Sequence, residues 1–154
     1  MTHALPRPAV ATDVPAVKAL IDAAFGHYVE RIGLVPAPMR ADHASNVAAG
    51  RVFVLGDPVR GLVVVVGEDD HLYLDTIAVD PAAQGTGLGR TLMDWVEARA
   101  RALGLPEVRL HTNAMMWENQ KLYERYGYEV VERRADGPYD RIHYRKLLNS
   151  PPIG

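Results

Sequence analysis

The amino-acid sequence predicts an α/β (α+β) fold built on a mixed, mostly antiparallel sheet of about seven strands with flanking helices. Segments with strand-like alternation recur along the 154-residue chain, and stretches with helical spacing of apolar residues lie between them. One long helical stretch separates two strands, which is the order of a β–α–β crossover. Because 48% of the residues are hydrophobic and 23% charged, we expect a single soluble domain over residues 1–154, with its core over 6–148 and a flexible tail over 149–154.

The first fifty residues are expected to contain one short strand, over 7–10, and two helices. The first helix begins at Thr12 or Asp13, which are N-cap residue types, and its apolar residues recur every three or four positions. A proline-rich break over 35–38 separates it from a second short helix over 42–49.

Three strands are expected next, over 51–55, 61–66 and 71–79. The second is rich in β-branched residues, as expected of a strand buried on both faces. The third strand should place alternate residues on opposite faces. One face carries Leu72, Leu74, Thr76 and Ala78, and the other carries Tyr73, Asp75, Ile77 and Val79.

The second half is expected to begin with a long amphipathic helix that ends at Gly104. The helix's inner stripe is predicted to consist of Leu88, Leu92, Trp95, Val96, Arg99 and Leu103. Strands over 107–112, 128–133 and 141–146 and a helix over 117–126 complete the expected fold.

The composition excludes several classes of function. The chain has no cysteine, which rules out thiolate nucleophiles, disulfides and Cys-ligated zinc within it. Its 17 Lys and Arg against 19 Asp and Glu leave a net charge of −2, so we expect no nucleic-acid partner. The longest apolar run, Leu62–Val66, is far shorter than the roughly 20 residues of a membrane helix, so we expect a cytoplasmic protein without a membrane partner. The six His residues lack metal-ligand spacing, so we expect no metal.

The glycine-containing segment 84–90 is the most informative part of the sequence. Its glycines allow positive φ angles, and the helix N-terminus that follows favours a phosphate group. A dinucleotide-binding loop would need a third glycine where Arg90 stands. A Walker loop would need glycine in place of Gln84 and lysine in place of Arg90.

Two motifs in this order resemble the signatures of the GNAT N-acetyltransferase superfamily. The first is Gln84-x-x-Gly87-x-Gly89 after the strand that ends at Val79, and the second is the helix with Leu122-Tyr123 followed by Gly127 and Tyr128. The spacing of the elements agrees from Arg7 to Leu147. The resemblance implies a three-layer fold, acetyl-CoA as cosubstrate, and direct attack by an acceptor amine on the thioester.

The resemblance also implies roles for particular residues. Cosubstrate contacts are implied for Ile77, Ala78, Val79, Gln84, Gly85, Thr86, Gly87, Leu88, Gly89, Arg90 and Asn119. Tyr123 is expected both to contact the cosubstrate and to act as the general acid that protonates the departing thiolate, because its phenol is weakly acidic. Many members carry an asparagine seven residues before this tyrosine, where this chain has Met116.

The residue that accepts the proton of the ammonium is left open by the sequence. Asp75 on the central strand, Glu30 after the first helix and His111 are candidates. Residues expected to line the acceptor pocket are Tyr28, Glu30, Arg31, Tyr73, Asp75, His111 and Tyr139.

A small-molecule amine is the expected acceptor, with a peptide or protein as the alternative, and a homodimer is possible. Two other functions compete with the enzyme. A non-catalytic acyl-CoA-binding or regulatory module would keep the loop from Gln84 to Gly89 without needing Tyr123. An unrelated nucleotide-binding domain would bind ATP or NAD instead of CoA.

Overall fold

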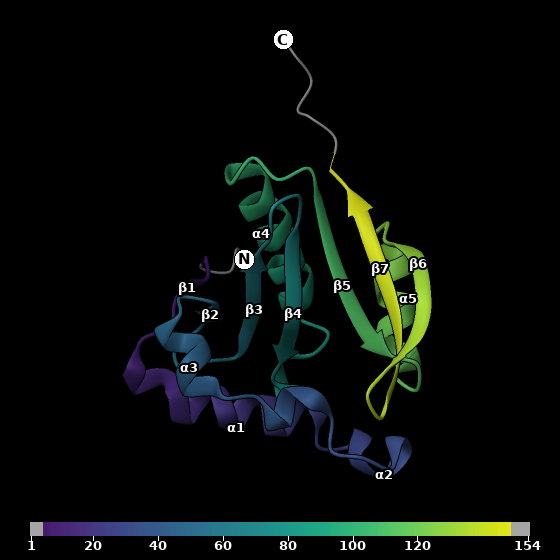
Figure 1. The fold of residues 1–154 in the computed structure, drawn as a ribbon. Helices are drawn as coiled ribbons and strands as arrows, with labels where there is room; N and C mark the ends of the chain where they lie inside the picture. Colours follow the sequence, from purple (N-terminus) through teal and green to yellow (C-terminus); the bar gives the residue numbers. More distant parts are fainter. Residues whose placement is uncertain (1–4, 149–154) are drawn as a thin grey trace. The chain divides into compact units, whose positions relative to one another are not determined.

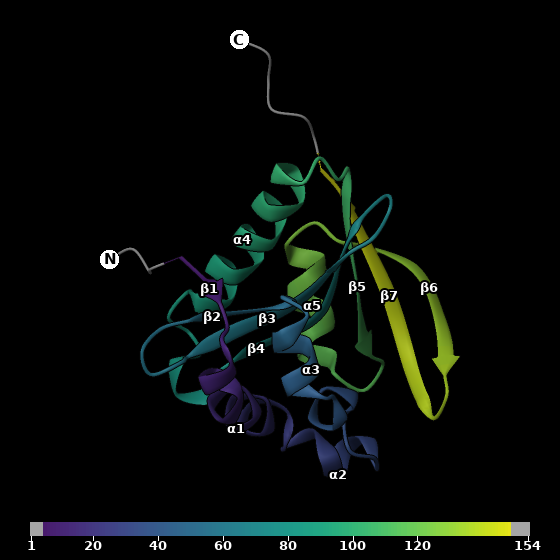
Figure 2. The same ribbon diagram turned by 60° about the vertical axis from the view of Figure 1, so that its left-hand side comes forward.

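The computed structural model describes residues 5–148, and the tail expected over 149–154 lies outside them. Its seven strands form one mixed sheet in the order β1-β2-β3-β4-β5-β7-β6, which confirms the predicted fold class (Figures 1 and 2). The strands are β1 (Arg7–Pro8), β2 (Val52–Leu55), β3 (Gly61–Gly67), β4 (Leu72–Val79), β5 (Glu107–Asn113), β6 (Glu129–Asp136) and β7 (Tyr139–Leu147). The α-helices are α1 (Val14–Phe25), α2 (Tyr28–Ile32), α3 (His43–Ala48), α4 (Leu88–Ala102) and α5 (Trp117–Arg125).

The chain divides into two compact units, each made of two separate stretches. The first unit contains residues up to Val66 together with Asp75–Val96. The second unit contains Gly67–Leu74 and the residues from Glu97 onward. The chain therefore passes from one unit to the other at the end of β3, inside β4 and again inside α4.

In the first unit, β2 is buried and α4 packs closely against β3. All four residues of β2 are buried, and β2 pairs with β3 in antiparallel register. A Cβ atom at Gly61, the first residue of β3, would lie 2.9 Å from Leu92 Cδ1 of α4. Only glycine lets the strand and the helix approach this closely.

The N-terminal part of the first unit differs in detail from the sequence prediction. The second half of the break predicted over 35–38 belongs to a short 3-10 turn over Ala37–Arg40, and residues before the break form α2, which the sequence analysis missed. α2 is only five residues long, so its apolar spacing is too short to be recognised. The second predicted helix is confirmed as α3, whose N-cap Asp42 accepts a hydrogen bond from the backbone N–H of Ser45 at 3.0 Å.

In the second unit, one sheet face is apolar and the other polar. Residues Leu72–Leu74 of β4 run parallel to β5, and β7 pairs antiparallel with both β5 and β6. Figure 1 shows β5, β7 and β6 side by side with α5 behind them. Tyr123 of α5 contacts the ring of Tyr144 on β7, so this helix covers the apolar face.

The predicted alternation of β4 is confirmed, but the predicted stripe of α4 is partly wrong. Even-numbered residues of β4 are buried and odd-numbered ones are half-buried. In α4, Arg99 is exposed and Leu103, after its last residue, is 50% exposed, whereas Met93, Glu97 and Ala100 are buried. The cost of burying the Glu97 carboxylate is offset because it accepts hydrogen bonds from Lys146 Nζ at 2.9 Å and from the Tyr128 hydroxyl at 3.3 Å.

None of the helices among residues 5–148 combines the length and the apolar character needed to cross a bilayer.

Candidate functional site

The glycine loop of the first unit connects β4 to the start of α4. Its entrance is a 3-10 turn over Pro81–Ala83, which is fixed where the Asp80 side chain accepts a hydrogen bond from Ala82 N at 2.9 Å. Gly85 and Gly87 then adopt φ angles of +83° and +84°. Residues with a side chain rarely adopt this left-handed conformation, which explains the glycine at both positions.

The donor set of this loop fits a diphosphate. Nothing lies within 4 Å of a Cβ atom built on Gly85 or on Gly87, so the backbone there faces open space. The first-turn N–H groups of α4, beginning at Leu88, have no carbonyl partner inside the helix. Such groups, with the positive end of the helix dipole, bind phosphate oxygens. The guanidinium of Arg90 meets Asp94 at 3.2 Å on the exposed surface of α4.

Two other residues implied as cosubstrate contacts lie on α5 in the second unit. Tyr123 is 5% exposed, and its ring centroid lies 6.2 Å from that of Tyr128 and 5.9 Å from that of Tyr144. These aromatic contacts hold the phenol ring in one place. Asn119 is half-buried, and its side-chain amide lies 3.6 Å from Met116 Sδ.

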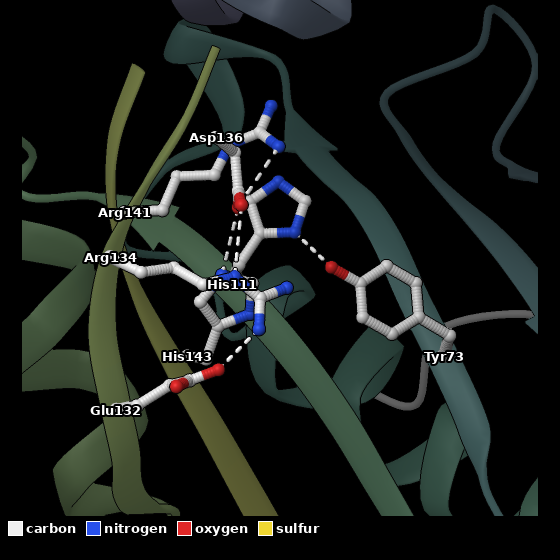
Figure 3. Close-up of polar contacts among 7 residues, drawn as sticks. All are labelled: Tyr73, His111, Glu132, Arg134, Asp136, Arg141 and His143. Carbon is white, nitrogen blue, oxygen red and sulfur yellow. Dashed lines mark hydrogen bonds and ion pairs between the residues drawn. The ribbon is translucent and has the colours of Figure 1, made fainter.

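A cluster of polar side chains occupies the other face of the second unit's sheet (Figure 3). We call it the His111 cluster; it consists of Tyr73, His111, Glu132, Arg134, Asp136, Arg141 and His143. The Tyr73 hydroxyl makes a short hydrogen bond to Nδ1 of His111. The rings of His111 and His143 lie side by side, with centroids 5.7 Å apart.

The carboxylate of Asp136 contacts all three basic side chains on its side of the cluster, those of Arg134, His143 and Arg141. Its Oδ1 accepts from Arg134 Nε at 2.9 Å, and its Oδ2 accepts from His143 Nε2 at 2.9 Å. Arg141 Nη1 lies farther from the same Oδ2, at 3.5 Å. Arg134 also pairs with Glu132.

These contacts determine which members of the cluster are charged. Burial, followed by the positive charge of Arg141, lowers the pKa of His111 to about 4. The hydrogen bond from Arg134 lowers the pKa of Asp136 to about 2. At neutral pH the imidazole of His111 is therefore uncharged, while Asp136 is a carboxylate.

The structure brings together some of the residues predicted for the acceptor pocket. Tyr73 and His111 are hydrogen-bonded to each other. The Cζ atom of Arg141 lies over the ring of Tyr139, 5.2 Å from the ring centroid. Tyr28 and Arg31 form a similar cation–π pair on α2, also at 5.2 Å. Glu30 is exposed on α2, and Asp75 is half-buried on β4.

Five members of the His111 cluster were missed by the sequence analysis: Glu132, Arg134, Asp136, Arg141 and His143. The pairing of β5 with β7 would have revealed two of them, since His111 stands opposite His143 and Asn113 opposite Arg141. Sequence alone predicts both strands but not their register.

Acid should destabilise the protein through His111. Its imidazole titrates near pH 6.5 in the unfolded chain and near 4 in the folded protein, so the unfolded state binds more protons between these values. Stability conferred by the neutral imidazole is complete above pH 6.5 and is lost as the pH falls, by about 2 kcal/mol at pH 5. Urea unfolding at pH 7 and pH 5 should show a larger loss for the native sequence than for His111→Gln. His43, whose pKa is also lowered by burial, is present in both proteins and contributes equally to both losses. Equal losses in the two proteins would therefore contradict the prediction.

The fold and the loop define the class of protein. A mixed seven-stranded sheet, in which a central strand leads through a glycine loop into a long helix, is that of an acyltransferase that uses acetyl-CoA. Residues 48–130, which are 83 of the 154, match the model of the acetyltransferase (GNAT) domain. The chain belongs to this family.

One relative of described activity matches part of the chain. An IAA acetyltransferase from Azospirillum brasilense is 30% identical over 79 residues, which are 51% of this chain and 50% of that protein. The chain thus matches about half the length of that relative.

Solved structures share the fold over nearly the whole chain. The ribosomal-protein-S18-alanine N-acetyltransferase of Escherichia coli is 23% identical with a TM-score of 0.75, and the match covers 96% of this chain and 95% of that one. The PaiA N-acetyltransferase of Thermoplasma acidophilum, solved in complex with coenzyme A, is 14% identical with a TM-score of 0.77, covering 93% and 98%.

Proposed function

We propose that the protein transfers the acetyl group of acetyl-CoA to a primary amine of a small molecule by direct attack. The observation that carries this proposal is the glycine loop. Its two left-handed glycines, the open space beside them and the helix N-terminus that follows suit the diphosphate of CoA. Membership in the acetyltransferase family supports the acetyl group as the one transferred.

In the proposed reaction, the amine nitrogen forms a C–N bond to the thioester carbonyl carbon and the C–S bond breaks. A carboxylate, Asp75 or Glu30, takes the proton that the ammonium loses, directly or through water. The hydroxyl of Tyr123 gives a proton to the departing thiolate, and the second proton that the nitrogen loses after the C–N bond forms restores the phenol, directly or through water. A backbone N–H near Ile77 or Ala78 stabilises the negative charge that develops on the carbonyl oxygen. The chain has no cysteine, so no acyl-cysteine intermediate forms on it.

The first test is ligand-induced stabilisation. Coenzyme A at a hundredfold excess over its Kd should raise the free energy of unfolding by about 3 kcal/mol, because it binds only the folded state. Thermal unfolding with CoA, ATP and NAD measures this effect. A shift with ATP or NAD but none with CoA would favour an unrelated nucleotide-binding domain and overturn the proposal.

A pair of glycine variants separates binding by the loop from general strain. Gly87 and Gly104 both have left-handed φ angles, of +84° and +73°, and an added Cβ meets nothing within 4 Å at either position. Alanine at either position should cost about 1–2 kcal/mol of stability. Only Gly87→Ala should also weaken the CoA-induced shift, because Gly104 follows the other end of α4.

A further inference from the structure

The hydrogen bond between Tyr73 and His111 determines which nitrogen of the imidazole carries its proton. A phenol is a stronger donor than a neutral imidazole, and an imidazole nitrogen is a stronger acceptor than a phenol oxygen. The Tyr73 hydroxyl therefore donates to Nδ1 of His111. Because a neutral imidazole has one N–H group, that group is on Nε2 and points away from Tyr73.

Arg141 is the cation of the cluster with the weakest pairing to its carboxylate. Asp136 accepts bonds of 2.9 Å from Arg134 and from His143, whereas Arg141 lies 3.5 Å from the same carboxylate. The Arg141 side chain is 20% exposed, and its guanidinium carries five N–H donors. It therefore has donors available for a further anion.

The free nitrogen of His111 and the guanidinium of Arg141 lie on the same side of the cluster. Figure 3 shows the ring nitrogen that is not bonded to Tyr73 turned toward the side occupied by the guanidinium. In line with this position, Arg141 has the largest effect of any charged group on the pKa of His111. The two side chains thus offer donors and positive charge to one region.

We propose that His111 Nε2–H and the guanidinium of Arg141 together bind a carboxylate of the acceptor, so that the preferred substrates are amines that also carry a carboxylate. This inference rests on the proposed acetyltransferase function and names its substrate class. An acidic wall for a purely cationic amine is disfavoured here, because Glu132 and Asp136 are already engaged by Arg134. Tyr73 is a positioning residue, since it fixes the imidazole proton on Nε2.

Matched acceptors test the inference. Amino acids and their amides are compared in a coupled assay that detects the thiol released from acetyl-CoA. The carboxylates should exceed the amides in kcat/KM by about 10- to 100-fold, as expected for a charged hydrogen-bond pair. Arg141→Gln should abolish this preference by raising KM for the carboxylates, and Arg141→Lys should retain part of it.

Arg133→Gln is the matched control. Arg133 lies on the same hairpin and pairs with Asp140 at 2.6 Å, with its side chain 64% exposed. This variant should keep the full preference for carboxylates. Equal rates for acids and amides in the native sequence, or an equal loss for both in Arg141→Gln, would overturn the inference and leave the acetyltransferase proposal intact.

A binding measurement covers the case in which no tested amine is acetylated. N-acetylglycine and N-acetylglycinamide are titrated while the ring resonances of His111 and His143 are followed by NMR. Only the carboxylate should shift these resonances, and only when Arg141 is present. Equal effects of both probes, or none from either, would overturn the inference. Failure of CoA to bind would instead overturn the proposed function.

Discussion

Tyr123→Phe is expected to lower kcat by about 100-fold or more, because a positioned general acid contributes about 10²–10⁴-fold. The Kd for CoA should change little, since the phenyl ring preserves the aromatic contacts with Tyr128 and Tyr144. If the phenol supplies the proton, the alkaline limb of the kcat–pH profile should also disappear in the variant. Steady-state kinetics from pH 6 to pH 10 would measure both effects.

Tyr144→Phe is the control for this experiment. It removes a hydroxyl from a residue of the same aromatic group that is 1% exposed and has no proposed part in the chemistry. An unchanged kcat in Tyr123→Phe would indicate that another group protonates the thiolate. Asp75→Asn and Glu30→Gln distinguish the two proposed bases, because loss of the true base should remove the acidic limb of the same profile.

Lys146→Met is expected to lower the free energy of unfolding by about 3 kcal/mol. The reason is that Glu97, whose side chain is 10% exposed, would lose the ammonium group that lies 2.9 Å from its carboxylate. A buried carboxylate that has lost its cation destabilises the folded protein far more than the intact ion pair does. Urea unfolding at pH 7 would measure the change.

Two further variants identify the cause. Arg145→Met removes a neighbouring ion pair with Glu129 whose side chains are 43% and 61% exposed, and it should cost less than about 1 kcal/mol. Glu97→Gln combined with Lys146→Met should recover most of the lost stability, since a neutral amide can still accept the hydrogen bond from Tyr128. Failure of the double variant to recover would mean that Lys146 acts through packing.

The sequence was sufficient to predict features that depend on neighbouring residues. The glycine loop and the alternation of β4 follow from backbone freedom and from a period of two, and both are present in the structure. α2 was missed because five residues are too few for a helical period to be recognised.

Features that depend on distant residues were predicted less well. Glu97 was left out of the inner stripe of α4 because a charged residue is rarely buried, and its compensation comes from Lys146, 49 positions away. Tyr73 and His111 were both candidates, but their contact spans 38 positions and requires the register of β4 with β5. Arg141 reaches the cluster through the pairing of β5 with β7, and Asp136 through the pairing of β6 with β7.

The division of each unit into two stretches has a consequence for synthesis and for truncation. The first unit needs Asp75–Val96, which the ribosome makes only after the Gly67–Leu74 stretch of the second unit. Each unit therefore becomes complete only after a stretch of the other unit has been made in between, so its folding during translation must wait for contacts between residues distant in sequence. A fragment that starts at Glu97 would contain all members of the His111 cluster except Tyr73. Without the Tyr73 hydroxyl, the proton of the His111 imidazole would no longer be fixed on one nitrogen.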